Sequence, residues 1–211
     1  MSDKYQFGDR AIYVPAPDGF TNVVGRFSRV TSRMSATEGA GLDLLAVHVP
    51  ETFIPRLKAS EDIDLEFYTK VSAIKSVRTV EVTNDTFKGV VADLEKNFDT
   101  YLDPSGTVMK NVEKTAEKGL ADIGSKTTVD LTATKNLGFF EKTPRLFSGM
   151  TVFTVEIYGR KVTTLATVSF LHVNQRLVAV YAYKMFPADN DVKELTAFTK
   201  KWTAKIIAAN K

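Results

Sequence analysis

The chain has 211 residues, of which 44% are hydrophobic, so it can fill the core of a globular protein. Its 28 basic and 25 acidic residues are mixed along the chain and leave a net charge of +3. This pattern lacks the clustered basic face of a nucleic-acid-binding protein. The absence of cysteine excludes disulfides, thiolate metal sites and cysteine nucleophiles.

The first ten residues, MSDKYQFGDR, predict a flexible N-terminal tail and lack the apolar core of a signal peptide. A short strand is predicted over residues 11–14. The prolines and the glycine of residues 15–20 predict an extended segment that ends in a turn. No linker divides the rest of the chain, so we expect one domain over residues 1–211.

Residues 25–42 are rich in small polar side chains, carry Arg26, Arg29 and Arg33, and end near the run EGAG. This composition predicts a mobile surface loop. The simpler interpretation of the three arginines is a solvated face. The alternative is that they contact an anion or a partner.

The middle of the chain alternates between runs of branched side chains and apolar residues at helical spacing. The elements predicted there are strands over residues 44–49 and 65–74, a short helix over 51–60, an accessory helix between Val108 and Ile123, and strands over 127–134 and 137–141.

A long helix is predicted over Asn84–Leu102, where apolar residues recur every three or four positions. Thr83 precedes it as an N-cap. Gly89 interrupts the helix at a cost of about 1 kcal/mol relative to alanine. We therefore expect a neighbour that packs close to Gly89.

The last part of the chain organises the fold. Runs rich in Val, Thr, Phe and Tyr predict strands over residues 150–157, 161–173 and 176–183, with a turn at 158–160. Asn174-Gln175 fits a tight two-residue turn, because asparagine tolerates the positive φ that such a turn requires. Both faces of this hairpin are largely apolar, so its strands should lie in a sheet that is covered on both sides.

Apolar residues at steps of three and four predict an amphipathic helix over residues 191–209, with Asp191 as N-cap and Trp202 as its anchor on the sheet. Together these elements predict an α+β fold. We expect an antiparallel sheet of six or more strands, flanked by two long helices and one accessory helix.

Three segments carry a resemblance: VPAPDGF at residues 14–20, LLAVHVP at 44–50 and LGFFEKTP at 137–144. They resemble an uncharacterised family of exported bacterial proteins that begin with a V/I-P-x-P-x-G-F motif and end in an amphipathic helix. The order of elements is similar to that of PsbP-like domains. The resemblance implies a bacterial, periplasmic or otherwise exported protein if a signal has been removed before Met1, and a cytoplasmic protein otherwise. These motifs mark turns, so no functional residue comes with the resemblance.

Only two histidines are present, His48 and His172, and each lies in a strand predicted to be interior. The simpler interpretation is a buried histidine with a satisfied hydrogen bond. A metal site would need both rings to meet a carboxylate. A Ser-His-Asp triad is not excluded by counting, although no G-x-S-x-G motif marks its serine. We therefore assign no catalytic residue, no metal ligand and no cofactor.

Aromatic residues are dense between residues 139 and 186. Most of them should fill the core, and the alternative is that some line a groove for a peptide or a small apolar ligand. The residues that the sequence proposes for ligand binding are His48, His172, Tyr181, Tyr183, Arg26, Arg29 and Arg33.

The absence of an assembled nucleophile, metal or nucleotide motif favours a non-catalytic bacterial accessory or binding domain that acts through protein contacts. One alternative is a small-molecule or peptide binder with an aromatic-lined pocket between sheet and helix. Another is a hydrolase with an unrecognised site, so enzymatic activity stays open and its absence is favoured. Another protein is the expected partner. No apolar run reaches the roughly 20 residues of a transmembrane helix, and the oligomeric state is not predicted.

Overall fold

The computed structural model describes residues 2–61, 63–124, 129–157 and 160–211. Its centre is a seven-stranded antiparallel sheet with the strand order β3-β4-β5-β9-β8-β7-β6. The α+β fold with an antiparallel sheet of six or more strands is therefore confirmed. The strands are β3 (Phe20–Asn22), β4 (Leu42–Pro50), β5 (Phe67–Ile74), β6 (Asp130–Thr143), β7 (Leu146–Ile157), β8 (Arg160–Val173) and β9 (Arg176–Met185).

The hairpin of β8 and β9 forms as predicted. Asn174 and Gln175 have φ values of 48° and 58°, and Val173 pairs with Arg176. A two-residue turn with positive φ at both positions matches the twist of the strands that it joins. The turn predicted at residues 158–160 and the start of the strand predicted over 127–134 lie partly outside the described residues.

The strands predicted over 127–134 and 137–141 are one strand, β6. Gly138, the second residue of the second predicted strand, has φ 96° and sits at a shift of the β6–β7 register. A bulge bends a strand without ending its pairing. The polar residues Lys135 and Asn136, which suggested a break between two strands, lie within β6.

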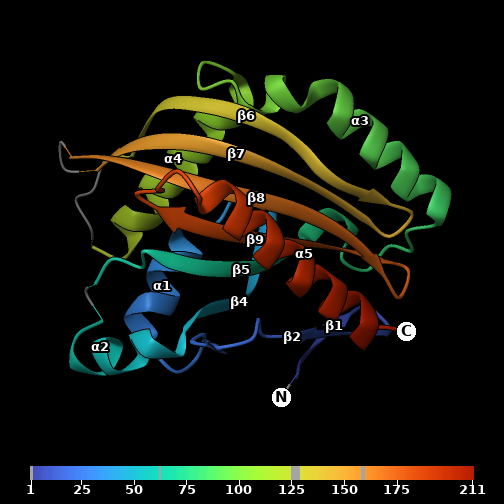
Figure 1. Cartoon of the computed structure of the whole chain (residues 1–211), viewed down its shortest axis with the longest axis horizontal. Coiled ribbons are helices and arrows are strands. Elements are labelled where there is room, and N and C mark those ends of the chain that lie inside the picture. The colour runs from blue at the N-terminus through green and yellow to red at the C-terminus, as the bar shows by residue number, and fades with distance from the viewer. Residues whose placement is uncertain (1, 62, 125–128, 158–159) are drawn as a thin grey trace.

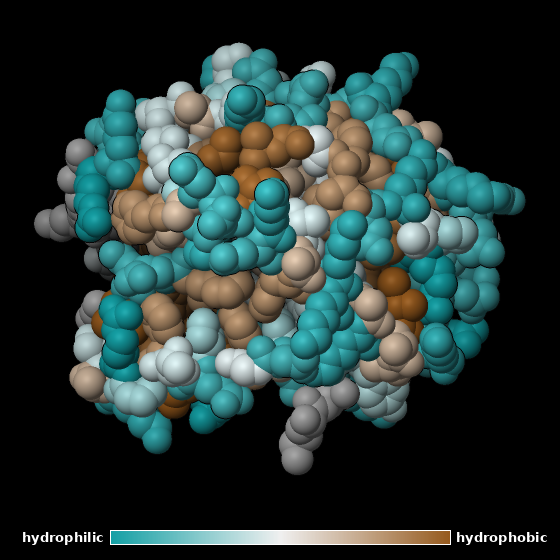
Figure 2. Space-filling model, viewed as in Figure 1, coloured by the Kyte–Doolittle hydropathy of each residue, from teal (hydrophilic) through white to brown (hydrophobic). Residues whose placement is uncertain are grey.

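One face of the sheet, called the α5 face below, is covered by α5 (Asp191–Ala209) and by a hairpin of β1 (Ser2–Phe7) and β2 (Arg10–Pro15) (Figure 1). Trp202 of α5 is 2% exposed, and its indole Nε1 donates to the carbonyl oxygen of Pro15 at 2.9 Å. Figure 2 shows the same side of the molecule, where apolar groups surface in separate areas between hydrophilic side chains.

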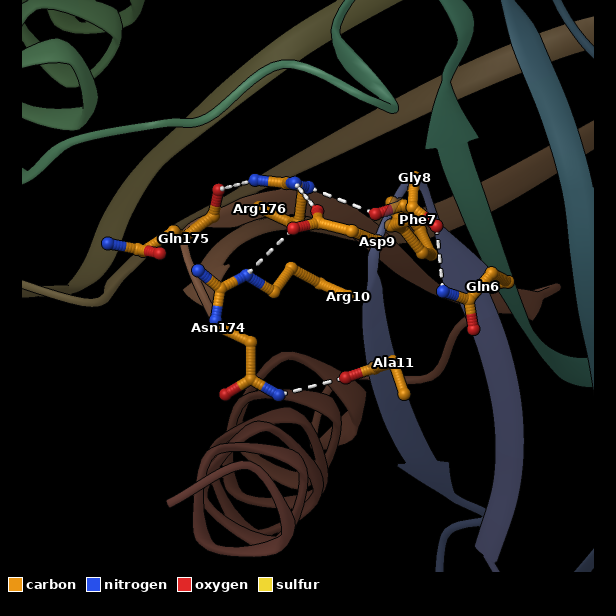
Figure 3. A network of polar contacts seen from close by, with 9 residues as sticks. All are labelled: Gln6, Phe7, Gly8, Asp9, Arg10, Ala11, Asn174, Gln175 and Arg176. Atoms are coloured by element: carbon orange, nitrogen blue, oxygen red, sulfur yellow. Dashed lines mark hydrogen bonds and ion pairs between the residues drawn. The ribbon is translucent and has the colours of Figure 1, made fainter.

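The β1–β2 hairpin corrects the prediction of a flexible tail. Phe7 is fully buried, and polar groups tie the hairpin to the β8–β9 turn (Figure 3). Arg176 is 4% exposed, donates through Nε to the carbonyl oxygen of Phe7 at 3.1 Å and pairs with Asp9 at 2.6 Å. Asn174 Nδ2 donates to the carbonyl oxygen of Ala11 at 2.9 Å. These partners lie more than 160 residues apart, so local composition did not reveal them.

The opposite face, called the α3 face, is covered by α1 (Ser28–Ala36), α2 (Ile54–Ala59), α3 (Asn84–Leu102) and α4 (Thr107–Asp122). The long helix α3 begins as predicted, because the backbone N–H of Thr86 donates to Thr83 Oγ1 at 3.1 Å. Helix α5 begins at Asp191, whose carboxylate accepts from the N–H of Ala188 at 2.6 Å. The predicted N-cap is thus the first helical residue.

The mobile loop predicted over residues 25–42 is wrong, because Ser28–Ala36 form α1. Val30 and Met34 are one helical turn apart and both are buried. The carboxylate of Glu61 accepts from the backbone N–H groups of Arg29 and Val30 at 2.7 and 3.2 Å, so it caps the helix from a distant segment. Two buried apolar residues and a cap from a distant segment were too weak a local signal to predict a helix from the sequence.

A close crossing joins α1 to α4. A Cβ atom on Gly119 would lie 2.0 Å from the carbonyl oxygen of Ala36. Gly89 was expected to have a close neighbour, and this expectation is wrong: a Cβ atom there would meet nothing within 4 Å. None of the helices in the described ranges is both long and apolar enough to cross a membrane.

These two glycines make a matched pair for mutation. Gly119→Ala should destabilise the protein by about 1–3 kcal/mol, because backbone must move to admit the methyl group. Gly89→Ala should stabilise it by about 0.5–1 kcal/mol, since α3 gains a better helix former in open space. Urea unfolding of both variants measures the difference. A neutral Gly119→Ala would contradict the close crossing.

Candidate functional site

The two histidines lie on opposite faces of the sheet, so their rings do not converge on one ion. His48 faces α5: its Nδ1 is 2.9 Å from Thr69 Oγ1, and its ring meets Trp202 edge-on at 5.7 Å. Burial lowers the pKa of His48 from 6.5 to about 4. His172 faces α3, donates through Nε2 to the carbonyl oxygen of Val82 at 2.6 Å and stacks on Phe87. Within the described part of the chain, no three metal-ligating side chains gather.

The three arginines lie in or just before α1 and do not gather at one site. Arg26 and Arg29 are exposed and border a shallow groove that also contains Glu61, the residue that caps the helix. Arg33 lies one helical turn after Arg29, outside this groove, and donates through Nη2 to the carbonyl oxygen of Ile63 at 2.9 Å. An internal carboxylate thus already occupies the helix terminus that an outside anion would seek.

Tyr181 and Tyr183 are brought together with a third tyrosine, Tyr68. The rings of Tyr68 and Tyr183 are stacked across β5 and β9, with centroids 4.8 Å apart. Tyr181 and Tyr183, two residues apart on β9, are also near-parallel, at 6.1 Å. Because side chains stand away from a sheet, the hydroxyl ends of this row point toward the helices on the α3 face.

A buried ion pair adjoins the tyrosines, and the sequence did not single it out. Lys70 and Ser72 follow Tyr68 on the same face of β5. Lys70 Nζ pairs with the carboxylate of Glu38, which comes from the segment between α1 and β4, and Ser72 Oγ donates to the same carboxylate at 2.6 Å. Lys70 and Glu38 are each 7% exposed. The available signal was a lysine inside a strand whose other central residues are buried.

We call the residues that meet here the tyrosine–lysine cluster: Glu38, Tyr68, Lys70, Ser72, Tyr181 and Tyr183. The cluster separates two apolar parts of the α3 face. On one side, α1 and α2 pack on β4. On the other side, α3 packs on β7 and β8. A polar strip therefore runs between two hydrophobic cores.

The three tyrosines of this cluster are half-buried, and no hydrogen bond joins their hydroxyls to another described residue. Burial raises the pKa of Tyr68, Tyr181 and Tyr183, and the negative charge of Glu38 raises it further. All three hydroxyls are therefore protonated at neutral pH. They can donate and accept hydrogen bonds, and they are not nucleophiles.

A groove of about 480 Å³ lies between α1 and α4 and reaches the cluster. Its lining includes Ser35 of α1, Thr115 and Lys118 of α4, and Glu38. Glu38 is the one residue of the cluster that lines this groove, and it also contacts Lys70, so it stands between the groove and the other cluster residues.

No family model matches this chain, and no curated protein is similar to it in sequence. Among solved structures, cyanobacterial PsbP from Synechocystis sp. PCC 6803 is similar over 99% of this chain and 90% of its own, with 12% identity and a TM-score of 0.36. The Ran-binding protein Mog1p of Saccharomyces cerevisiae is similar over 100% and 95%, with 7% identity and a TM-score of 0.29. The sequence analysis expected a PsbP-like order of elements, and a PsbP protein is among the similar structures. Similarity this low carries no function to the present chain.

Proposed function

We propose that this protein is a non-catalytic binding domain that holds a small polar ligand, or a polar segment of a peptide, at the tyrosine–lysine cluster. The observation that carries the proposal is the row of three half-buried tyrosines, whose hydroxyls bond to no other described residue, beside a buried ion pair. These hydroxyls are not among the fully buried polar atoms, so each keeps some contact with solvent, which a ligand can replace. A ligand that enters between α1 and α4 would supply the missing partners.

The chemistry of the cluster favours binding over catalysis. The tyrosines keep their protons because their pKa values are raised, and Lys70 is neutralised by Glu38. Of the two histidines, His48 is fully buried and His172 is 7% exposed, and both lie away from this row of residues. Binding specificity requires only directed hydrogen bonds, and the cluster offers several in one place.

Removal of the three hydroxyls tests this function. The triple variant Tyr68→Phe, Tyr181→Phe, Tyr183→Phe should be as stable as the wild type, since the hydroxyls bond to no other described residue. We expect a thermal-shift panel of metabolites, carboxylates, nucleosides and short peptides to give hits with the wild type. A ligand at 100 times its Kd adds about 2.7 kcal/mol of stability. The triple variant should lose these shifts.

Tyr13→Phe is the matched control, because Tyr13 lies on β2 and is 38% exposed, away from the cluster. It should keep every hit of the wild type. Hits that survive in the triple variant would show that the ligand binds elsewhere, and the proposal would fail.

A second candidate is an accessory role through protein contacts. Its support is an exposed apolar pair on α4, where Val108 and Val112 are 45% and 39% exposed one helical turn apart. In that case, Val108→Glu with Val112→Glu would abolish partner binding, and the triple tyrosine variant would leave it unchanged.

A further inference from the structure

Glu38 is the only acidic residue that the described structure places in contact with Lys70. It belongs to no helix or strand: it follows the C-cap of α1 and precedes β4. Its carboxylate nevertheless reaches the sheet, where one oxygen pairs with Lys70 Nζ and the other accepts from Ser72 Oγ at 2.6 Å. A carboxylate from a connecting segment thus fills a position formed by two residues of β5.

That position has the donors that a carboxylate requires. Lys70 supplies the cation, and Ser72 supplies a hydroxyl on the same face of the same strand. The Tyr181 hydroxyl stands next to them, since Tyr181 pairs with Lys70 across β5 and β9. Only the first two donors are used by Glu38 within the described residues. Tyr181 is therefore a further hydrogen-bonding residue beside the position that Glu38 fills.

A buried ion pair also contributes little to the free energy of folding. Removal of both charges from water costs several kcal/mol, and apolar side chains of the same volume often stabilise a fold as well or better. Here the pair lies beside two hydrophobic cores that could have been continuous. The presence of the Lys70–Glu38 pair is consistent with a site that must present a cation.

The side chain of Glu38 lies next to a groove. Glu38 lines the groove between α1 and α4, which opens to the surface beside Lys118. Rotation of the Glu38 side chain would carry the carboxylate from Lys70 toward the groove. The same groove would admit the competitor, past the oppositely charged side chains of Lys118 and Asp122.

We propose that Glu38 is an internal stand-in for the ligand, and that the ligand of the tyrosine–lysine cluster carries a carboxylate that replaces Glu38 on Lys70 and Ser72. This inference rests on the proposed binding function and narrows it to one chemical class. In the free protein, Glu38 then occupies the carboxylate position on Lys70 and Ser72. Competition with Glu38 reduces the affinity of the protein for an added carboxylate.

Benzoate and benzamide are the probes that test this inference, because they have the same shape and differ in charge. Glu38→Ala empties the carboxylate position and leaves Lys70 unpaired. Benzoate should raise the Tm of this variant by several degrees at saturation, while benzamide should not. Benzoate should bind the variant at least about tenfold more tightly than it binds the wild type, as measured by calorimetric titration.

Two further variants keep the test decisive. If Glu38→Ala does not fold, Glu38→Gln keeps the volume and an acceptor for Ser72, and it should show the same preference for benzoate over benzamide. Lys70→Met in the Glu38→Ala background removes both charges together, which buried pairs often tolerate. This double variant should fold and lose the response to benzoate.

The inference is overturned if benzoate binds the wild type and the Glu38 variants equally, if benzamide binds as well as benzoate, or if the response survives Lys70→Met. These results differ from a failure of the binding function itself. Panel hits that the triple tyrosine variant loses would leave that function standing, even if benzoate gave no response.

Discussion

Trp202→Ala should destabilise the protein by about 3–5 kcal/mol, the range for the loss of a buried large aromatic side chain. Trp202 is 2% exposed and packs among side chains of β2, β5 and β9. Its indole is also the partner of the Pro15 carbonyl oxygen. The variant would therefore open a cavity between α5 and the sheet and weaken the attachment of the N-terminal hairpin. Chemical denaturation followed by circular dichroism gives the change in the free energy of unfolding.

Trp202→Phe is the graded control for this prediction. It keeps an aromatic ring in the core, but leaves the carbonyl oxygen of Pro15 without its donor at a cost of about 1–3 kcal/mol. The alanine variant should be the less stable of the two. A loss below about 1 kcal/mol in Trp202→Ala would show that α5 is not anchored in this way.

Acid should destabilise the protein through His48. The folded-state pKa of His48 is about 4, against 6.5 for an ordinary histidine, because burial disfavours the charged ring. Between these values the unfolded chain binds a proton that the folded protein does not bind. Stability contributed by the neutral ring is therefore complete above about pH 6.5 and is lost as the pH falls toward 4. The total is about 3 kcal/mol, at about 1.36 kcal/mol for each pKa unit.

His48→Gln removes this titration and keeps a polar group near Thr69 Oγ1. The free energy of unfolding of the wild type should fall between pH 6.5 and pH 4 more steeply than that of the variant. The difference between the two curves isolates His48 from the carboxylates, which titrate in both proteins. Parallel curves would mean that burial does not lower the pKa of His48 in the folded protein.

Much of the fold was predictable because its signals are local. The turn at Asn174-Gln175 fixes the register of β8 and β9, and the periodic apolar residues of Asn84–Leu102 and Asp191–Ala209 define two helices. The elements that sequence analysis missed are held by distant partners. Glu61 caps helix α1, and Arg176 holds the end of strand β1 at Phe7.

The candidate site was predictable only in part, for the same reason. Tyr181 and Tyr183 stood out by residue type and by their strand. Their neighbours Tyr68 and Lys70 lie more than 100 residues earlier, and only the pairing of β5 with β9 brings them together. Glu38 lies in a segment where composition predicted a solvated loop. A charged residue in an apolar strand, such as Lys70, is the local sign that would have directed attention to β5.

The measurement that tests the ligand site most directly is a benzoate titration of Glu38→Ala labelled with ¹³C-tyrosine. The ring signals of Tyr68, Tyr181 and Tyr183 should move together and saturate, because these rings border the emptied carboxylate position. The signals of Tyr13 and Tyr101, which lie on β2 and at the end of α3, should stay in place. If a folded protein shows no movement in the three cluster signals at saturating benzoate, the ligand site is not where we place it.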